Sequence, residues 1–245
     1  MLLDLLLISA TVSVVIALLL ILGPFLRRRY VMARLYLVWL LLAIRLLVPF
    51  RLELPQAPVE LEILPPSGIV EQRPSAAGEA AEKPTVTVAA VLPYLWAAGA
   101  AAVLCRHAGA YWLFRLRVKP YLREEEPPRR GEPGVYRCLR IRGPMLVGYF
   151  RPMILLPEAE YTPQEREAVL THERAHYRRG DVWYKLVLLF ACSVHWFNPL
   201  VWLMVRRAAQ DMEFACDEKI IRIRGAEYQK QYAAAIVKSA ERSEA

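Results

Sequence analysis

The N-terminal residues Leu2 to Phe25 form an almost unbroken apolar stretch, and this feature limits the possible folds more than any other. A helix of this length can cross a hydrocarbon core of about 30 Å. A signal peptide would carry positive charge before the apolar run and a small-residue cleavage site after it. Here the basic residues Arg27, Arg28 and Arg29 follow the run. We therefore predict an uncleaved membrane span at about 2–25.

Two further apolar stretches, at about 31–50 and 85–105, are predicted to be spans as well. Arg34 and Arg45 lie near the ends of the first stretch, where long side chains can reach the membrane interface. The second stretch contains the small residues 97–102, which allow another helix to pack closely. Self-association into a homodimer is therefore an open alternative.

The distribution of charge sets the orientation of these spans. The Pro-rich loop 51–84 carries more Glu than Lys and Arg, whereas basic residues follow the first and third spans. The positive-inside rule predicts that the N-terminus and this loop lie outside the cell membrane and that residues 111–245 are cytosolic. The net charge of +8 is explained by arginines that flank the spans, so direct nucleic-acid binding is not expected. The lipid bilayer is the first expected partner.

The cysteines agree with a reducing compartment. They lie at Cys105, Cys138, Cys192 and Cys216, without CxxC spacing and without a short-range pairing pattern. A disulfide framework is therefore not expected.

The predicted fold class is an α+β membrane protein. A transmembrane region, 1–110, precedes a cytosolic domain, 111–245, that contains a small β-sheet. An amphipathic continuation of the third span should reach Val118 and stop at Pro120. The charged, Pro-rich segment 123–133 is expected to be an exposed linker.

Short strands and one well-marked helix follow. Alternating apolar residues predict strands at 135–141, 145–150 and 153–156. Pro152 favours an edge position for the last strand. A helix should then run from Pro163 to Arg179, because Thr162 is a good N-cap and Glu165 completes a capping box.

That helix carries the pattern most typical of a chemical function. His172 and His176 are four residues apart and share one helix face, so both imidazoles can reach one ion. Neutral imidazoles hold Zn²⁺, which lowers the pKa of a bound water to about 7. Glu173 is offset by one position and can act as the general base that takes a proton from this water. The sequence therefore predicts one Zn²⁺ per chain.

A catalytic zinc usually has three protein ligands and one open position. Glu213 and Asp217 stand downstream, four residues apart, on one face of a predicted helix that begins after Asn198. Glu213 is the expected third ligand, and Asp217 is expected to accept a hydrogen bond from a ligand imidazole. Cys216 is expected to point away from the Glu213 face.

The apolar stretch 182–205 resembles a fourth span in composition. A full crossing would separate Glu213 from His172, and the stretch is interrupted by His195 and a helix-breaking Pro199. We therefore predict a helical hairpin over 182–212, either buried in the domain or dipping into the cytosolic leaflet. His195 is expected to be a packed histidine rather than a metal ligand.

These motifs resemble the gluzincin metallopeptidases, which pair HExxH with a later ExxxD. The sequence is most similar to their membrane-bound branch, the β-lactam sensor-transducers and antirepressor relatives. The resemblance includes three spans, the segment Gly143 to Pro152 before the motif, and the segment His195 to Leu200 between the two motifs. It covers nearly the whole chain.

The resemblance implies the same site, with His172, His176 and Glu213 as zinc ligands and Glu173 as the base. It implies a regulated endopeptidase in signal transduction that cleaves a cytosolic transcriptional repressor, itself, or both. It also implies that the strand at 145–149 borders the cleft as an edge strand, to which an extended substrate could add. Family sensors usually continue into a fourth span and an extracellular ligand-binding domain, whereas this sequence ends at Ala245, shortly after the motifs. Direct β-lactam binding is therefore not expected of these residues.

Two other functions stay open. A housekeeping membrane metalloprotease, of the prenyl-protein or quality-control type, shares both motifs. A non-catalytic receptor or scaffold with a structural zinc is disfavoured by the presence of Glu173, and structural sites more often have four ligands rich in Cys. Tyr228, Tyr232 and Arg222 are weak candidates for stabilising an oxyanion.

Overall fold

The computed structural model describes residues 2–29, 32–48, 88–224, 232–234 and 237. The chain is mostly helical, with one small mixed sheet. The predicted loop 51–84 and the oxyanion candidate Tyr228 lie outside the described residues.

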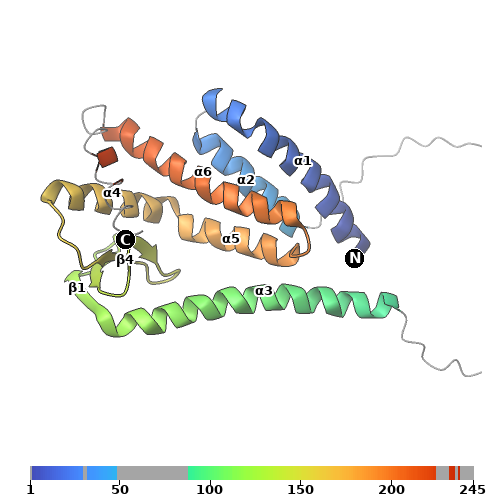
Figure 1. Cartoon of the computed structure of the whole chain (residues 1–245), viewed down its shortest axis with the longest axis horizontal. Helices are drawn as coiled ribbons and strands as arrows, with labels where there is room; N and C mark the ends of the chain where they lie inside the picture. Colours follow the sequence, from blue (N-terminus) through green and yellow to red (C-terminus); the bar gives the residue numbers. More distant parts are fainter. Residues whose placement is uncertain (1, 30–31, 49–87, 225–231, 235–236, 238–245) are drawn as a thin grey trace, which may run out of the picture.

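Four helices pack into one bundle (Figure 1). They are α1 (Leu2–Arg29), α2 (Met32–Leu47), α5 (Asp181–Val194) and α6 (Pro199–Arg224). Their shared core is apolar and includes Ile16 of α1, Trp39 of α2, Leu188 of α5 and Met204 of α6, none more than 2% exposed. The N-terminal helices and the C-terminal hairpin therefore bury one another's apolar faces.

The connection between α5 and α6 is short and contains two buried polar residues. His195 is fully buried, and its Nε2 lies 3.1 Å from the carbonyl oxygen of Leu46, as expected of a packed histidine. Asn198 donates hydrogen bonds to Ser9 and Ser13 of α1, at 2.8 and 2.7 Å. These contacts of His195 and Asn198 hold the connection between α5 and α6 against α1 and α2.

Helix α3 (Val88–Val118) runs along the other side of α5 (Figure 1). Trp96 donates a hydrogen bond to the carbonyl oxygen of Val194, at 2.8 Å. Gly99 allows this close approach, since a Cβ there would clash with the indole of Trp196. The predicted stop at Val118 is confirmed, and a 3₁₀ turn, η1 (Lys119–Tyr121), follows.

The sheet has the strand order β1-β2-β4-β3. Its strands are β1 (Leu122–Glu126), β2 (Gly134–Cys138), β3 (Met145–Val147) and β4 (Met153–Pro157). β2 and β4 are parallel, and the two outer pairs are antiparallel.

Two predictions for this region are wrong. The segment 123–133 is not wholly a linker, because its first residues belong to β1. β1 is an edge strand whose three middle residues, Arg123, Glu124 and Glu125, are exposed, so it lacks the apolar alternation that marks a strand. The strand at 153–156 is central rather than at an edge, since Pro152 precedes β4 and removes no donor from its ladder.

Helix α4 (Pro163–Arg179) has the predicted bounds. The Thr162 side chain accepts from the backbone N–H of Glu165 at 3.2 Å, and the Glu165 side chain accepts from the backbone N–H of Thr162 at 3.1 Å. Gly180 ends the helix with a φ of 71°, in the left-handed region that favours glycine. α5 begins at the next residue, so α4 leads directly into the bundle.

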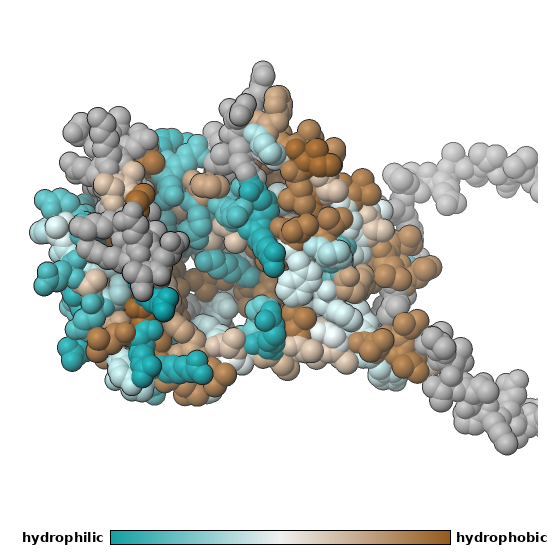
Figure 2. Space-filling view, in the orientation of Figure 1, coloured by the Kyte–Doolittle hydropathy of each residue, from teal (hydrophilic) through white to brown (hydrophobic). Residues whose placement is uncertain are grey.

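Among the described helices, one is long and apolar enough to cross a membrane by length and composition, at Leu3–Leu26. Figure 2 shows hydrophobic side chains over the bundle and over the N-terminal part of α3, and hydrophilic side chains gathered around α4 and the sheet.

Candidate metal centre

Helices α4 and α6 bring the three predicted metal ligands together. The Nε2 atoms of His172 and His176 lie 3.0 Å apart. Oε2 of Glu213 lies 3.5 Å from the first of these nitrogens and 3.0 Å from the second. Donor atoms around a tetrahedral zinc, at 2.0–2.1 Å from the ion, are about 3.3 Å apart. The separations in this chain therefore fit one zinc ion.

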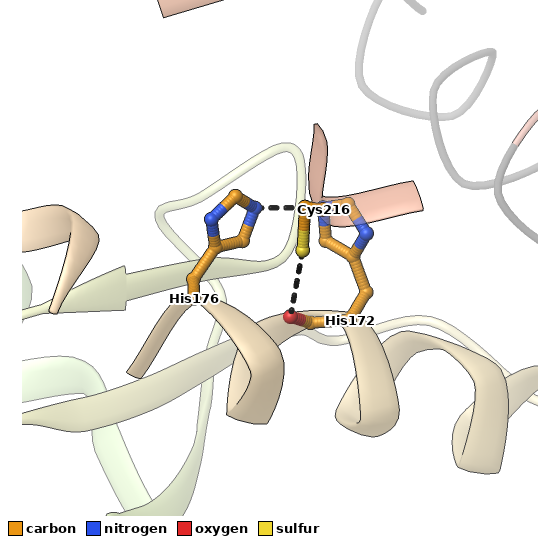
Figure 3. Close-up of side chains that lie close together, drawn as sticks. All are labelled: His172, His176 and Cys216. Atoms are coloured by element: carbon orange, nitrogen blue, oxygen red, sulfur yellow. Dashed lines mark hydrogen bonds between the residues drawn. The ribbon is translucent and has the colours of Figure 1, made fainter. Parts of the chain in front are cut away.

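Cys216 belongs to the same cluster, and the prediction that it points away is wrong. Its sulfur and the two imidazoles lie within 4.8 Å of one another. Figure 3 shows the thiol directed toward the carbonyl oxygen of His172, at 3.9 Å. Positions 213 and 216 are three residues apart on α6, and residues at this spacing are neighbours on a helix surface just as residues four apart are. Glu213 and Cys216 can therefore face the same pair of imidazoles.

The outer nitrogen of each imidazole has a carboxylate partner. Nδ1 of His172 lies 3.2 Å from Asp217 and 2.7 Å from the hydroxyl of Tyr232, which itself donates to Asp217 at 2.7 Å. Nδ1 of His176 lies 2.6 Å from Oδ2 of Asp181. In both rings this places the proton on Nδ1 and leaves the Nε2 lone pair for a metal.

Asp217 therefore lies where the sequence predicts it, whereas Asp181 is a partner that the sequence does not predict. Asp181 is 1% exposed and begins α5, directly after the glycine that ends α4. A signal is present in the sequence, since an aspartate follows His176 by five residues across a helix stop. Spacing alone does not reveal that the chain turns back there.

The acidic surroundings control the charge of the two histidines in the metal-free protein. Burial opposes protonation of His172, but hydrogen bonds to Asp217 and Glu213 outweigh it and raise its pKa to about 10. Burial likewise opposes protonation of His176, and hydrogen bonds to Asp181, Cys216 and Glu213 raise its pKa to about 12. The facing Nε2 atoms are 3.0 Å apart, so charge on the His176 ring acts to lower the pKa of His172, by less than the hydrogen bonds raise it. The centre therefore favours positive charge.

The carboxyl groups of Glu213 and Glu173 respond in opposite ways. Burial acts to raise the pKa of Glu213, but hydrogen bonds from both histidines hold it below its usual value. Glu173 is 7% exposed, and this burial raises its pKa. A carboxylate with a raised pKa is a better proton acceptor than one in water.

A cavity of about 390 Å³ opens onto the centre. Its walls come from α3, the β3 strand with the turn after it, α4, α5 and α6. Glu173 lines this cavity, as do Tyr111 and Tyr149. Among the described residues that line it, Lys185 is the only lysine or arginine, and it lies 4.0 Å from Oε1 of Glu213.

The structure does not support two of the oxyanion candidates. Tyr232 is hydrogen-bonded behind His172 and is not among the lining residues of the cavity. Arg222 lines a different hollow, beside α2. Lys185 is better placed, and sequence reasoning missed it because one lysine in an apolar helix carries no spacing signal.

A helix with HExxH, a glutamate from a second helix and a buried glutamate beside them form an arrangement typical of metallopeptidases. A family model described as BlaR1 peptidase M56 matches residues 3–245, and the chain belongs to this family.

Curated relatives agree with this assignment. The chain is 33% identical over 100 residues to the regulatory protein BlaR1 of Bacillus licheniformis. It is 25% identical over 101 residues to the methicillin resistance mecR1 proteins of Staphylococcus aureus and Staphylococcus epidermidis. Each of these matches covers 40% of this chain and 17% of the relative, so the matched segment is a small part of those longer proteins.

Proposed function

We propose that this chain is a membrane-anchored zinc endopeptidase that acts in signal transduction. Its substrate would be a cytosolic regulator such as a transcriptional repressor, the chain itself, or both. The observation that carries the proposal is the convergence of His172, His176 and Glu213 at separations of 3.0–3.5 Å, beside a cavity that Glu173 also lines.

The residues divide the chemistry among them. His172, His176 and Glu213 would hold the metal, which when bound supplies Lewis acidity to a water and to the peptide carbonyl. Glu173 accepts the proton of the attacking water and passes it to the departing amine. Lys185 is positioned to stabilise negative charge on the carbonyl oxygen.

The β3 strand offers a way to bind an extended substrate. It is the edge strand on the side of the cavity, as the family resemblance predicts. Met145, Leu146 and Val147 line the cavity, so a peptide that adds to this edge would pass over the metal centre. Main-chain pairing recognises extended conformation, which agrees with an endopeptidase that cuts an exposed segment of a protein.

The membrane placement rests on the apolar helices. α1 meets the criteria for a span, whereas α2 and α3 only overlap the second and third predicted spans. We propose a multi-pass protein with its N-terminus outside and the site in the cytosol, as the positive-inside rule predicts. The hydrophilic surface around α4 and the sheet supports placing the site in water rather than in the bilayer (Figure 2).

The test is metal content and peptide hydrolysis of the full chain, purified in mild detergent. We expect one equivalent of zinc, and cleavage of a quenched peptide library that stops with a chelator and returns with zinc. Glu173→Gln should keep the zinc and lose about 10²- to 10⁴-fold in rate, because it removes only the base.

Glu167→Gln is the matched control. It removes a carboxylate from the same helix at an exposed position outside the cavity, and it should change neither property. Peptide hydrolysis that survives Glu173→Gln would rule out the proposed mechanism, in which Glu173 is the general base. Zinc without hydrolysis of any peptide or of the chain itself would favour the scaffold alternative.

A further inference from the structure

The hydroxyl of Tyr36, on α2, reaches the metal centre through one intermediate. It donates a hydrogen bond to Oδ1 of Asp181, at 3.0 Å. The other oxygen of this carboxylate, Oδ2, lies 2.6 Å from Nδ1 of His176. The two sequence positions are 145 residues apart, so no local pattern relates them.

Several contacts hold Tyr36 in place. Its ring stacks on that of Tyr184, with centroids 4.3 Å apart, and the hydroxyl of Tyr184 donates to the carbonyl oxygen of Tyr36 at 3.2 Å. The guanidinium of Arg179 also lies over the Tyr36 ring, 4.6 Å from its centroid. Nε of Arg179 is 3.5 Å from Oδ1 of Asp181, so two donors fix the same oxygen.

The orientation of this carboxylate matters for the metal centre. Asp181 is 1% exposed and the His176 side chain is 9% exposed, so water cannot replace a lost partner freely. A carboxylate held at one oxygen presents the other in a fixed direction to Nδ1, and this sets the ring plane of the histidine. The direction of the Nε2 lone pair follows from that plane.

We propose that Tyr36 is a positioning residue for His176, and that it acts by holding Asp181. The packing of α2 against α5 thereby sets the ring orientation of His176, a proposed zinc ligand on α4. A displacement of α2 that lengthens the Tyr36–Asp181 hydrogen bond would loosen the metal without touching any ligand. This inference rests on the proposed function only in that the centre must bind zinc.

The test is a mutant cycle on zinc affinity, measured on the full chain in detergent by competition with a chelator of known affinity. Asp181→Asn should weaken binding by about 10- to 100-fold. Tyr36→Phe keeps the stacked ring and should weaken binding by about three- to tenfold. In the double variant the Tyr36→Phe loss should vanish, because a residue that acts through Asp181 has no effect once that carboxylate is gone.

Tyr184→Phe is the matched control, since it deletes a hydroxyl from the same stack but not the one that faces Asp181. It keeps the stacked ring and loses only a hydrogen bond to the Tyr36 backbone, so it should change zinc affinity and the absorption spectrum of the cobalt-substituted protein far less than Tyr36→Phe does. Thermal unfolding of the metal-free variants shows whether each of them is folded. Equal effects of the two Phe variants, or losses that multiply in the double variant, would overturn the proposal.

The outcomes separate this proposal from the proposed function. If zinc binds and the Tyr36 and Asp181 substitutions are coupled as expected, but no peptide is hydrolysed, the peptidase function is excluded and the positioning role of Tyr36 is supported. Zinc binding without coupling would remove only the positioning role. A wild-type protein that takes up no zinc would remove both.

Discussion

Two side chains of α6, one carboxylate and one thiol, reach the same pair of imidazoles. The carboxylate of Glu213 lies within 3.0–3.5 Å of both Nε2 atoms, and the Cys216 sulfur and the ligand nitrogens of the two imidazoles lie within 4.8 Å of one another. Cys216 is also fully buried, where a thiolate is costly without a metal. We therefore propose Glu213 as the third ligand and the Cys216 thiol as a hydrogen-bonding neighbour of His176.

We predict that substitutions of Glu213 and Cys216 lower zinc affinity to different extents. Glu213→Ala should lower zinc affinity by about 100-fold or more, because a lost ligand costs more than a partner behind a ligand. Cys216→Ala should change it by less than about tenfold. Competition with a chelator measures both. A larger loss of zinc affinity for Cys216→Ala than for Glu213→Ala would identify the Cys216 thiol as the third ligand.

The raised pKa of the histidines predicts a pH dependence for the metal-free protein. A histidine whose folded pKa is raised contributes stability that is complete below its unfolded value of about 6.5. For His172 that contribution is lost as the pH rises toward about 10. The difference in unfolding free energy between wild type and His172→Gln should therefore be larger at pH 6 than at pH 10. Denaturant titrations at both pH values measure it, and an equal difference would contradict the charge balance described for the centre.

The sequence contains most of the site, because most of the site lies on two helices. His172, Glu173 and His176 follow from helical spacing, and Asp217 follows from its distance to Glu213 once α6 is taken as a helix. Asp181, Tyr36 and Lys185 could not be predicted in this way. They enter through the turn between α4 and α5 and through packing of distant helices, neither of which leaves a periodic pattern.

At the scale of elements, the turn after β3 depends on one glycine. Gly148 has a φ of 107°, and a Cβ there would clash with the carbonyl oxygen of Arg151. Gly148→Ala should therefore destabilise the protein by about 1–3 kcal/mol. It should also raise KM for a peptide substrate, because β3 lines the cavity. Thermal unfolding and peptide kinetics measure the two effects.

Gly131→Ala is the comparison for this turn. Gly131 has a φ of 81°, but the space that a Cβ would occupy there is open, so its substitution carries the conformational cost without the clash. It lies away from the cavity and should leave KM unchanged. Equal stability losses for the two glycines would show that the Arg151 contact is easily relieved.

Helices are easier to predict than strands in this chain for a physical reason. α4 has a capping box and a glycine stop, and the apolar runs of α1 and α2 are unmistakable in composition. β1 is stabilised mainly by its ladder with β2 and by ion pairs such as Glu126 with Arg166, at 2.6 Å. A strand held by long-range pairing and surface charge has no local signature, so its sequence resembles a linker.

At the scale of the whole molecule, α1 and α2 share a core with α5 and α6. The polar contact of Asn198 with Ser9 and Ser13 lies within this bundle, where water competes poorly. Asn198→Ala should therefore lower the unfolding free energy by about 1–3 kcal/mol, since it leaves two hydroxyls without this donor. Tryptophan fluorescence during denaturation in detergent measures the loss.

Thr11→Ala is the control for this interface. The Thr11 hydroxyl donates within its own helix α1, to the carbonyl oxygens of Leu7 and Ile8, so its removal should be nearly neutral. A similar loss for both variants would mean that hydroxyl chemistry in α1, rather than the junction with the hairpin, sets the stability.

The residues around the metal centre lie far apart along the chain, and this determines when during synthesis the centre can be complete. Tyr36 and Trp39 lie near the beginning of the chain, and their partners Asp181 and Asp211 lie 145 and 172 residues further on. Glu213 is supplied by α6, the last long helix among the described residues. During synthesis a growing chain therefore holds both histidines for some time before the third ligand leaves the ribosome. A nascent chain consequently lacks the full set of proposed ligands, so the proposed peptidase would be inactive until α6 has been synthesised.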